Sequence, residues 1–372
     1  MRWLLKAKRS LALASLVAGW SSSTETLVAS LSPTSNENGA LDLLPSHRLL
    51  KLIERNRSNT PRKAIPLVGI HDALSARILS NHGAEALFVS GFGVSASRLG
   101  QPDAGILTRS DLEQTVQQIQ SSLGARCAGT SSEDETNNEN LTMPPLLLVD
   151  CDTGFGGAIN LIQTIRNLAR IGVAAVSIED QMFPKRCTYV AGKKVTVVSR
   201  EEAVDRVRTA VMACINPVTK EKDILLIART DCRMALGLEE ALTRCQEFEK
   251  LGADIVYAEN LQSPSEYEML RAALKPETIC MLAQVQQLSN DNENEAERTL
   301  YNINDIGSMG FDLGLFGVTA LQATVQALEA TSREFFQNQG LVNPTNLASL
   351  EKVKSTVGFP ELDELLEDYD CQ

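Results

Sequence analysis

The segment Leu146–Gly157 reads Leu-Leu-Leu-Val-Asp-Cys-Asp-Thr-Gly-Phe-Gly-Gly. Four branched apolar residues in a row predict a strand that is buried on both faces. The run ends at Asp150 and Asp152, and glycines then lead into a segment with helical spacing. Because residues i and i+2 of an extended segment share a face, we expect both carboxylates to leave the strand end in the same direction.

A pair of neighbouring carboxylates at a strand end is typical of a metal site. Two like charges so close raise each other's pKa unless a cation lies between them. Ligands that are all oxygen favour a hard divalent ion, Mg2+ or Mn2+. The alternative is that one aspartate caps the following helix while the other is solvated. Because glycines and small residues surround the pair, we predict a metal site at Asp150 and Asp152.

Apolar runs and helical segments alternate along the rest of the chain, which predicts eight strands with a helix after each. The predicted strands are Pro66–Ile70, Ala86–Val89, Leu146–Val149, Ala174–Ile178, Ile224–Ala228, Ile255–Ala258, Ile279–Ala283 and Phe311–Phe316. The predicted helices are His47–Glu54, Ser75–His82, Leu112–Leu123, Leu161–Ile171, Glu201–Ala213, Leu238–Leu251, Pro264–Ala273, Ile303–Met309 and Thr319–Phe336. This alternation favours an α/β fold, a (β/α)8 barrel of the TIM type over residues 46–340, rather than an open sheet.

Polar residues follow six of the predicted strands, at the face where barrels of this kind carry their active sites. In chain order they are Ser90-Gly91-Phe92-Gly93, Asp150 with Asp152, Glu179-Asp180, Arg229-Thr230-Asp231, Glu259-Asn260 and Gln284. Solvation at the barrel rim is the simpler explanation for one charged strand end. It does not explain charge at four consecutive strands, with one arginine opposite several acids. The pattern therefore predicts an active site.

The glycine-rich segment after the second strand, residues 91–96, imitates a dinucleotide-binding fingerprint. Nucleotide binding of that kind requires a regular helix directly afterwards, and the sequence of residues 98–103, Arg-Leu-Gly-Gln-Pro-Asp, predicts a break instead. We therefore expect the backbone N–H groups of Gly91 and Phe92 to hold a substrate carboxylate or oxyanion.

Cys187 and Arg229 each allow two interpretations. Cys187 follows Lys185 and Arg186, and two adjacent cations lower the pKa of a thiol, which would suit an acid or base. A chance surface thiol is an equally good explanation of that spacing. Arg229 is either an ion-pair partner for neighbouring acids or a bidentate clamp for a substrate carboxylate, and the second use is the commoner one in an acidic cleft.

Composition limits the classes of function. The 372 residues carry a formal net charge of −12, with 43% hydrophobic and 22% charged residues, as in soluble globular proteins. No basic patch offsets the negative charge, so a nucleic-acid or anionic-membrane partner is not expected. An anionic substrate remains possible, because a metal ion and one arginine can invert the local field.

The cysteines and histidines of the chain further limit which catalytic and metal sites are expected. Eight cysteines contain no CxxC pair, and five of them lie in or beside apolar runs: Cys151, Cys214, Cys232, Cys245 and Cys280. They are expected to be reduced, buried thiols. The chain has only three histidines, none of them after the metal strand, which disfavours Ser-His-Asp catalysis and histidine-rich zinc sites.

The ends of the chain and two insertions are expected to lie outside the barrel. Residues 1–24 combine four basic residues, no acid and a short apolar run, which predicts a targeting segment and an organellar destination. The composition favours the mitochondrion over the plastid or the secretory pathway. Residues 25–45 are predicted to be a disordered spacer and 341–372 a tail of helices. The acidic segments Ser131–Leu141 and Ser289–Glu297 are predicted surface loops.

Six motifs together resemble the isocitrate lyase/phosphoenolpyruvate mutase superfamily from about residue 48 to about residue 336. They are Ser90–Gly93 with Gly100–Asp103, Asp150–Gly156, Ile178–Gln181, Pro184–Cys187, Ser199–Ala203 and Ile227–Asp231. The resemblance implies a barrel whose last helix is swapped between the subunits of a homodimer or homotetramer. It also implies Mg2+ or Mn2+ as cofactor and a small carboxylate substrate, a 2-oxo or 2-hydroxy acid whose C–C or C–P bond is broken through an enolate.

The resemblance also implies roles for individual residues. Asp150, Asp152 and, through water, Glu179 would bind the metal ion. The residues that would bind the oxyacid are Ser90, Gly91, Phe92 and Arg229, with Glu259 and Gln284 on the neighbouring strands. Asp103 matches an aspartate beside the metal and the substrate, and Cys187 matches the general acid of the lyase branch.

Three departures from the family pattern bear on the reaction. Thr188-Tyr189 follows the cysteine where lyases have Gly-His, Asn260-Leu261 follows Glu259, and Ala283–Gln286 replaces an asparagine region. The sequence therefore predicts a Mg2+-dependent carbon–carbon lyase of the 2-methylisocitrate lyase type with a rebuilt pocket. A hydrolase of oxaloacetate or a related oxoacid, a C–P mutase and an inactive metal-binding scaffold remain the alternatives.

Overall fold

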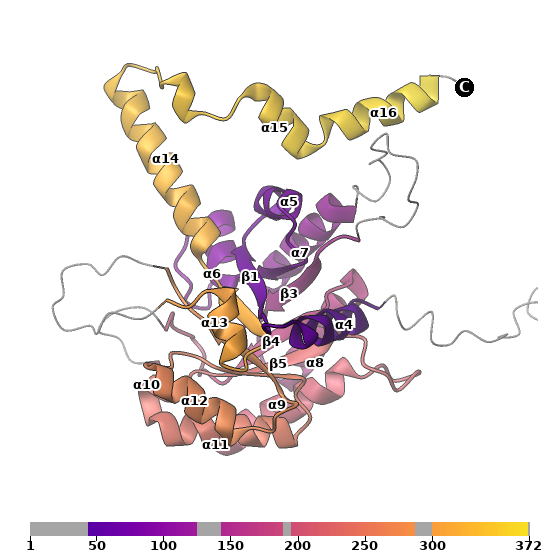
Figure 1. Ribbon diagram of the computed structural model, residues 1–372, viewed down its shortest axis with the longest axis vertical. Helices are drawn as coiled ribbons and strands as arrows, with labels where there is room; N and C mark the ends of the chain where they lie inside the picture. The colour runs from indigo at the N-terminus through magenta and orange to yellow at the C-terminus, as the bar shows by residue number, and fades with distance from the viewer. Residues whose placement is uncertain (1–43, 125–142, 189–194, 287–299, 371–372) are drawn as a thin grey trace, which may run out of the picture. The chain divides into compact units, whose positions relative to one another are not determined.

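A computed structural model describes residues 44–124, 143–188, 195–286 and 300–370 of the chain (Figure 1). The predicted targeting segment at residues 1–24 and both acidic insertions lie outside these ranges. So does nearly all of the predicted spacer at residues 25–45.

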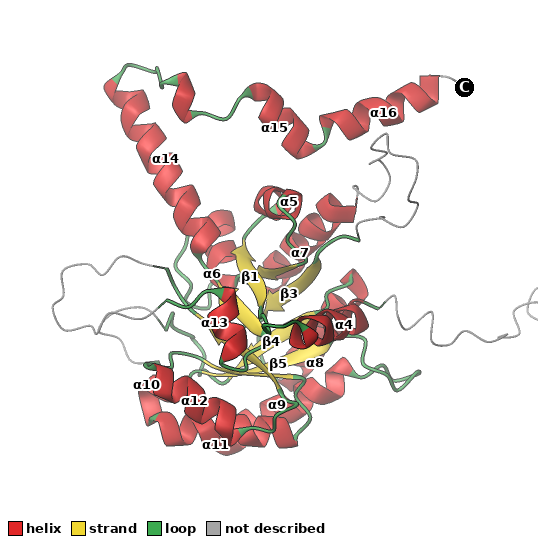
Figure 2. Ribbon diagram, viewed as in Figure 1, coloured by secondary structure: helices red, strands yellow, loops and turns green. Residues whose placement is uncertain are grey.

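Eight parallel strands pair in chain order and close into a barrel surrounded by helices, which confirms the predicted fold (Figure 2). The strands are β1 (Ile65–Ile70), β2 (Ala86–Val89), β3 (Leu146–Asp150), β4 (Ala175–Glu179), β5 (Leu225–Thr230), β6 (Ile255–Ala258), β7 (Ile279–Ala283) and β8 (Leu313–Phe316). The helices up to the last strand are α4 (Pro45–Ser58), α5 (Ala73–Asn81), α6 (Gly91–Val94), the π-helix η1 (Ser95–Leu99), α7 (Arg109–Gly124), α8 (Ala158–Ile171), α9 (Arg200–Cys214), α10 (Arg233–Leu236), α11 (Leu238–Lys250), α12 (Pro264–Ala273) and α13 (Ile303–Ser308).

The side-chain alternation of each strand divides the core into an inner and an outer part. Phe88 on β2 and Leu148 on β3 belong to the cluster that fills the barrel interior. Their neighbours Val89 and Val149 belong to a second cluster, formed with the surrounding helices. Every residue of β2, β3, β4 and β6 is buried, on both faces of the strand, which explains why these strands read as continuous apolar runs in the sequence.

Helix α4 closes the end of the barrel opposite the carboxyl ends of the strands. Its apolar residues Leu49, Leu52 and Ile53 join the interior cluster. Near its carboxyl end, Arg57 forms two hydrogen bonds to the buried carboxylate of Asp312, at 2.7 and 2.8 Å. The predicted leading helix is therefore part of the barrel core.

The segment after β2 shows the break that residues 98–103 predicted. The four residues of α6 and the π-helix η1 cover only Gly91 to Leu99, so no long regular α-helix follows the strand. The break comes at Gly100, whose φ of +60° is left-handed. The helical stretch is therefore short, and the chain turns back at Gly100 toward Asp103.

The chain after β8 forms α14 (Thr319–Gln337), the 3-10 helix η3 (Pro344–Asn346), α15 (Leu350–Val357) and α16 (Phe359–Asp370) (Figure 1). No residue of α14 is buried, and Leu328 and Phe336 are 61% and 80% exposed. Within the described ranges, no helix has the length and apolar content to cross a bilayer.

Candidate active site

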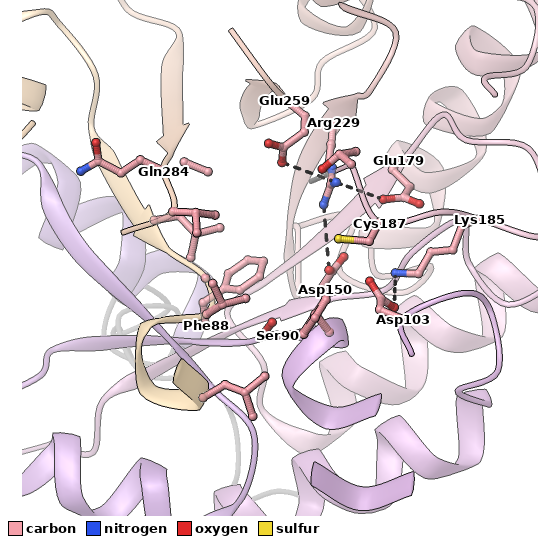
Figure 3. Close-up of a pocket in the computed structure, with 18 of the residues that line it drawn as sticks. Phe88, Ser90, Asp103, Asp150, Glu179, Lys185, Cys187, Arg229, Glu259 and Gln284 are labelled. Atoms are coloured by element: carbon pink, nitrogen blue, oxygen red, sulfur yellow. Dashed lines mark ion pairs between the residues drawn. The ribbon is translucent and has the colours of Figure 1, made fainter. Parts of the chain in front are cut away.

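A cavity of about 530 Å³ opens at the carboxyl ends of the strands (Figure 3). It is lined by most of the predicted site residues: Ser90, Phe92, Asp103, Asp150, Glu179, Cys187, Arg229, Glu259 and Gln284. The other two, Gly91 and Asp152, are buried next to Asp150. A Cβ atom on Gly91 would lie against the carboxylate of Asp150, and the N–H of Asp152 donates a hydrogen bond to that carboxylate. The structure thus brings the predicted residues together at one place.

Strand alternation explains why these side chains point into the barrel mouth. Leu146 and Leu148 face the interior, so Asp150 is the next residue of the inward series on β3. On β5, Leu225 and Ile227 are followed in the same way by Arg229. By the same alternation, Ser90, Glu179 and Glu259 continue the inward series of β2, β4 and β6. The charged residues therefore form the top layer of a barrel that is apolar below.

Asp150 and Asp152 converge, but not for the reason that the sequence suggested. Asp150 is the last residue of β3, whereas Asp152 lies beyond it with a left-handed φ of +50°. A turn, not the pleat of an extended strand, therefore brings the second carboxylate back to the first. Gly91 marks the point of convergence, because a Cβ atom there would lie 3.2 Å from one carboxylate oxygen of each aspartate.

Lys185 is a site residue that sequence reasoning treated only as a neighbour of Cys187. Its ammonium group is buried, lies 2.8 Å from Oδ1 of Asp103, and also pairs with Asp152. Burial by itself lowers the pKa of Lys185, but the surrounding carboxylates outweigh burial and raise it well above its usual range. Burial raises the pKa of Asp152 to about 6, against the opposing attraction of Lys185.

Glu179 is buried with neither carboxylate oxygen hydrogen-bonded. Burial raises its pKa well above the usual range, although Arg229 acts in the opposite direction. Among the described residues, no three His, Cys, Asp or Glu side chains lie close enough to form a complete inner-sphere set of metal ligands. An ion held by one or two carboxylates and otherwise by water needs no such set. The oxygens of Glu179 accept no hydrogen bond and, within the described ranges, have only the ion pair with Arg229, so they fit an ion of that kind.

Arg229 is surrounded by acids. Its Nη2 lies 2.9 Å from Oδ1 of Asp231 and 3.5 Å from oxygens of both Glu179 and Glu259. The guanidinium also lies over the ring of Tyr257, at 5.6 Å from the centroid. Burial lowers the pKa of Arg229, but the acids outweigh burial and raise it well above its usual range. Arg229 therefore has structural partners and also presents a permanent positive charge to the cavity.

Cys187 has a half-buried thiol on the cavity wall. In Figure 3 its sulfur lies between Arg229 and Asp150, which favours a role in the site over that of a chance surface thiol. The other five described cysteines are buried, and none of the six forms a disulfide. The prediction of reduced, buried thiols is therefore confirmed for the described part of the chain.

The start of α6 supplies backbone donors at the cavity. Ser90 caps this helix, and its hydroxyl accepts a hydrogen bond from the N–H of Gly93 at 3.2 Å. The N–H groups of Gly91 and Phe92 come first in the helix, where no carbonyl one turn earlier is available to them. N–H groups at the start of a helix can bind an oxyanion, and this role of Gly91 and Phe92 stays a prediction.

The predicted substrate-binding residues that directly follow β6 and β7, Glu259 and Gln284, already have partners inside the protein. The hydroxyl of Tyr257 donates a short hydrogen bond to Glu259. The side-chain amide of Gln284 donates to the carbonyl of Tyr301 at 2.6 Å and accepts from its N–H at 3.0 Å. Gln284 therefore lines the cavity while its polar atoms hold the chain at Tyr301.

A buried network behind the site fixes the ends of β4 and β5. Asp180 accepts hydrogen bonds from the hydroxyl of Thr230 at 2.5 Å and from the N–H of Asp231 at 2.8 Å. The guanidinium of Arg244, only 1% exposed, donates to the same carboxylate at 2.9 Å. Arg206 donates to the carbonyl of Glu179 at 2.8 Å. These contacts hold the backbone that carries Glu179 and Arg229.

Known proteins resemble this chain across the whole barrel. A sequence model of the family described as phosphoenolpyruvate phosphomutase matches residues 57–336. The 2,3-dimethylmalate lyase of Eubacterium barkeri is 31% identical over 242 residues, which cover 65% of this chain and 74% of that protein. The 2-methylisocitrate lyase of Shewanella oneidensis is 31% identical over 82% of this chain and 93% of its own length.

A solved structure gives a similar result. An oxaloacetate acetylhydrolase in complex with the inhibitor 3,3-difluorooxalacetate superimposes with a TM-score of 0.72 at 28% identity. The superposition covers 88% of this chain and 97% of that one. All the predicted site residues, from Ser90 to Gln284, lie inside the matched family range.

Proposed function

The chain belongs to the phosphoenolpyruvate mutase/isocitrate lyase superfamily, and from this premise we propose that it is a divalent-metal-dependent carbon–carbon lyase. Its substrate is a small 2-hydroxy or 2-oxo acid with two or three carboxylates, as for enzymes of the 2-methylisocitrate lyase type. The observation that carries the proposal is the thiol of Cys187 on the wall of the cavity that holds the carboxylate cluster. A lyase needs a proton donor at that place after the bond has broken.

The metal ion of the proposed reaction is Mg2+ or Mn2+. Asp150, Asp152 and Glu179 would hold it, Glu179 through water. A bound divalent ion supplies Lewis-acid polarisation of a substrate oxygen. The oxygens of buried Glu179, which accept no hydrogen bond, support this assignment.

The protein's own residues bind the substrate and transfer its protons. The N–H groups of Gly91 and Phe92 and the guanidinium of Arg229 bind the substrate carboxylates and orient the bond to be broken. Asp103 accepts the proton of the 2-hydroxyl group, and the 2-carbon becomes a carbonyl as the C–C bond breaks.

The electron pair of the broken bond passes to the departing carbon, whose own carboxylate delocalises it as an enolate. Cys187 then donates one proton to this carbon. The substrate loses one proton and gains one, so the reaction consumes none overall. Lys185, paired with Asp103 and Asp152, holds the Cys187 segment over the cavity.

Product analysis tests this proposal against its alternatives. The purified enzyme with Mg2+ is incubated with a panel of hydroxyacids and oxoacids. Release of pyruvate or glyoxylate from a hydroxyacid is the expected result. Oxalate and acetate from oxaloacetate would instead indicate a hydrolase, the alternative that the superposition with oxaloacetate acetylhydrolase supports. Turnover of a phosphonate would indicate a C–P mutase, and no turnover of any compound an inactive scaffold.

We also propose that the protein is a homodimer or homotetramer in which α14 packs on a neighbouring subunit. The support is that α14 buries none of its residues and exposes apolar side chains such as Val325 and Leu328. Exposed apolar surface of this extent is typical of a subunit contact. The organellar localisation stays a prediction from residues 1–24.

A further inference from the structure

Gln181 lines the cavity two residues beyond the end of β4, and none of the roles proposed above uses it. The residue is only 2% exposed. Because a buried side-chain amide loses its contacts with water, its oxygen and its NH2 group both need partners inside the protein. The partners of Gln181 therefore indicate what the residue does.

The two ends of this amide bond to two different parts of the site. Its Nε2 donates to Oδ2 of Asp231 at 3.2 Å, and its Oε1 accepts the backbone N–H of Arg186 at 2.8 Å. A carboxylate can only accept a hydrogen bond and an N–H can only donate one, so these partners fix the orientation of the amide. An acid or an apolar residue at this position could not make both bonds.

Asp231 connects Gln181 to the guanidinium of Arg229. Its Oδ1 lies 3.0 Å from Nε and 2.9 Å from Nη2 of Arg229, while its Oδ2 accepts the bond from Gln181. Burial raises the pKa of Asp231, whereas the charge of Arg229 and the hydrogen bond from Gln181 act in the opposite direction. Both partners therefore stabilise the carboxylate that lies between them.

The backbone of Gln181 is itself held in place. Gln181 forms an antiparallel bridge with Val197, and the N–H of Met182 donates to the carbonyl of Thr196 at 2.8 Å. Arg206 on α9 donates to the carbonyl of Gln181 at 2.9 Å. The amide therefore extends from a fixed point at the barrel mouth.

The N–H that Gln181 accepts belongs to the Cys187 segment, residues 184–188. Arg186 directly precedes Cys187, whose sulfur lies between Arg229 and Asp150 in Figure 3. The ion pairs of Lys185 attach this segment to the carboxylates beside the proposed metal site. The bond to Gln181 attaches it to the side of the cavity that carries Arg229.

We infer that Gln181 is a positioning residue that holds the thiol of Cys187 at a fixed place relative to Arg229. Asp231 makes the connection on one side, and the backbone of Arg186 makes it on the other. A carboxylate bound by Arg229 then lies where the thiol can donate its proton. That use of the thiol rests on the proposed lyase function, whereas the position of the segment can be measured without catalysis.

The reactivity of the Cys187 thiol measures this position. Full-length enzyme with Mg2+ is treated with iodoacetamide, with and without saturating oxalate, and peptide mapping by mass spectrometry follows Cys187 among the eight cysteines. Oxalate bound by Arg229 shields a thiol that stays beside it, so we expect it to slow the alkylation of Cys187 in the wild type about tenfold. Gln181→Met keeps the length of the side chain but makes neither hydrogen bond. In this variant the effect of oxalate should fall below about twofold.

Gln163→Met is the matched control, because it makes the same change at an exposed position of α8 that does not line the cavity. Its alkylation should match that of the wild type. Calorimetry should give similar dissociation constants for oxalate in the wild type and both variants, since Asp231 still holds Arg229. Equal protection in the wild type and in folded Gln181→Met, or no protection in the wild type, overturns the inference.

A donor–acceptor exchange separates a specific hydrogen bond from a general effect on packing. Gln181→Glu places a second carboxylate against Asp231 and should remove the protection by oxalate. Adding Asp231→Asn supplies an NH2 group to that carboxylate and keeps an oxygen for Arg229, so the double variant should regain most of the wild-type protection. A double variant no better protected than Gln181→Glu overturns the inference. Gln181→Met decides the question if the charged variants do not fold.

Steady-state kinetics separates this inference from the lyase function. A catalytic group displaced by about 1 Å costs about 10²-fold in rate, so kcat of Gln181→Met should fall by about that factor while KM stays within about twofold. Loss of protection in a protein without turnover supports the positioning role and contradicts the lyase function. An undiminished kcat in Gln181→Met overturns the positioning role and leaves the lyase function standing.

Discussion

The ammonium group of Lys185 lies 2.8 Å from Oδ1 of Asp103, and the same group pairs with Asp152. These contacts join the segment after β4 to the segment after η1 and to the turn after β3. Cys187 lies two residues beyond Lys185, so the ion pairs fix the distance between the thiol and the carboxylate cluster. A shift of the Cys187 segment therefore requires the separation of buried charges, which is costly.

Replacing Cys187 tests the proposed proton donor. Cys187→Ser keeps the size and the hydrogen bonding of the side chain, but a hydroxyl is a far weaker acid than a thiol. We expect kcat to fall by roughly 10²–10⁴-fold, the usual contribution of a general acid, with little change in KM. Steady-state kinetics of the variant measures both constants.

The neighbouring Thr188→Ser variant is the control, because it changes one methyl group of the same segment and should retain nearly full activity. An unimpaired Cys187→Ser enzyme would contradict the lyase mechanism and favour the hydrolase.

Removing Asp152 tests the metal site. Asp152→Ala should abolish Mg2+ binding and activity while the circular dichroism spectrum stays native, because the turn lies above a separate barrel core. Asp205→Ala, an exposed acid on α9, is the matched control. Full activity of Asp152→Ala in the presence of a chelator would exclude the metal site.

The pH dependence of metal binding follows from the same carboxylate. Burial raises the pKa of Asp152 to about 6, and a metal ligand must be deprotonated. The apparent affinity for Mg2+, measured by calorimetry, should be constant above pH 6 and fall about tenfold per pH unit below it. An affinity that does not change between pH 7 and pH 5 would show that Asp152 does not control binding.

Glu179 should reduce the stability of the metal-free protein. Burial raises its pKa, so the folded state holds a proton that the unfolded state releases at pH values above the ordinary value of 4.5. Stability is therefore lost as pH rises from about 4.5 through the raised folded pKa. Glu179→Gln carries no charge and should have a higher free energy of unfolding than the wild type at pH 8, and a similar one at pH 4.5. Urea titrations in a chelator measure both, and a less stable variant at pH 8 would refute the expectation.

Asp312 should stabilise the closed end of the barrel. Its carboxylate is 1% exposed, bonds to Arg57 and Arg62, and accepts the N–H of Cys280 at 3.0 Å. Asp312→Ala should lower the free energy of unfolding by about 3 kcal/mol, as expected when one partner of a buried ion pair is removed. The exposed pair of Arg55 with Glu85 is the control, and Arg55→Ala should cost less than about 1 kcal/mol. Equal effects in the two variants would contradict the assigned role.

Oligomeric state tests the role of α14. Light scattering should show the intact protein as a dimer or larger. Truncation after Gly317 should give insoluble protein, because the helix is then missing from every subunit. The variant Leu328→Asp, at a 61% exposed apolar position, should weaken association without unfolding the barrel. A stable, active monomer of the intact chain would contradict the swapped arrangement.

The sequence by itself determined the barrel and the face that carries the site. Continuous apolar runs predict strands buried on both faces, and their alternation with helical segments predicts a parallel closed sheet. Because polar residues follow six of the eight runs, the positions of Asp150, Glu179, Arg229 and Glu259 at the barrel mouth also followed from the sequence. These features are local, because the alternation of side chains along a single strand is enough to predict which residues face the barrel interior.

Only the tertiary structure decided which groups meet. The pairing of Lys185 with Asp103 joins residues from different segments, and no spacing in the sequence encodes their distance. The left-handed turn at Asp152 and the engagement of Gln284 by Tyr301 depend in the same way on contacts across the barrel mouth. The cavity likewise combines residues that lie far apart in the chain, from Phe88 on β2 to Gln326 on α14. Such a space is a property of packing in three dimensions, which a linear pattern of residue types does not contain.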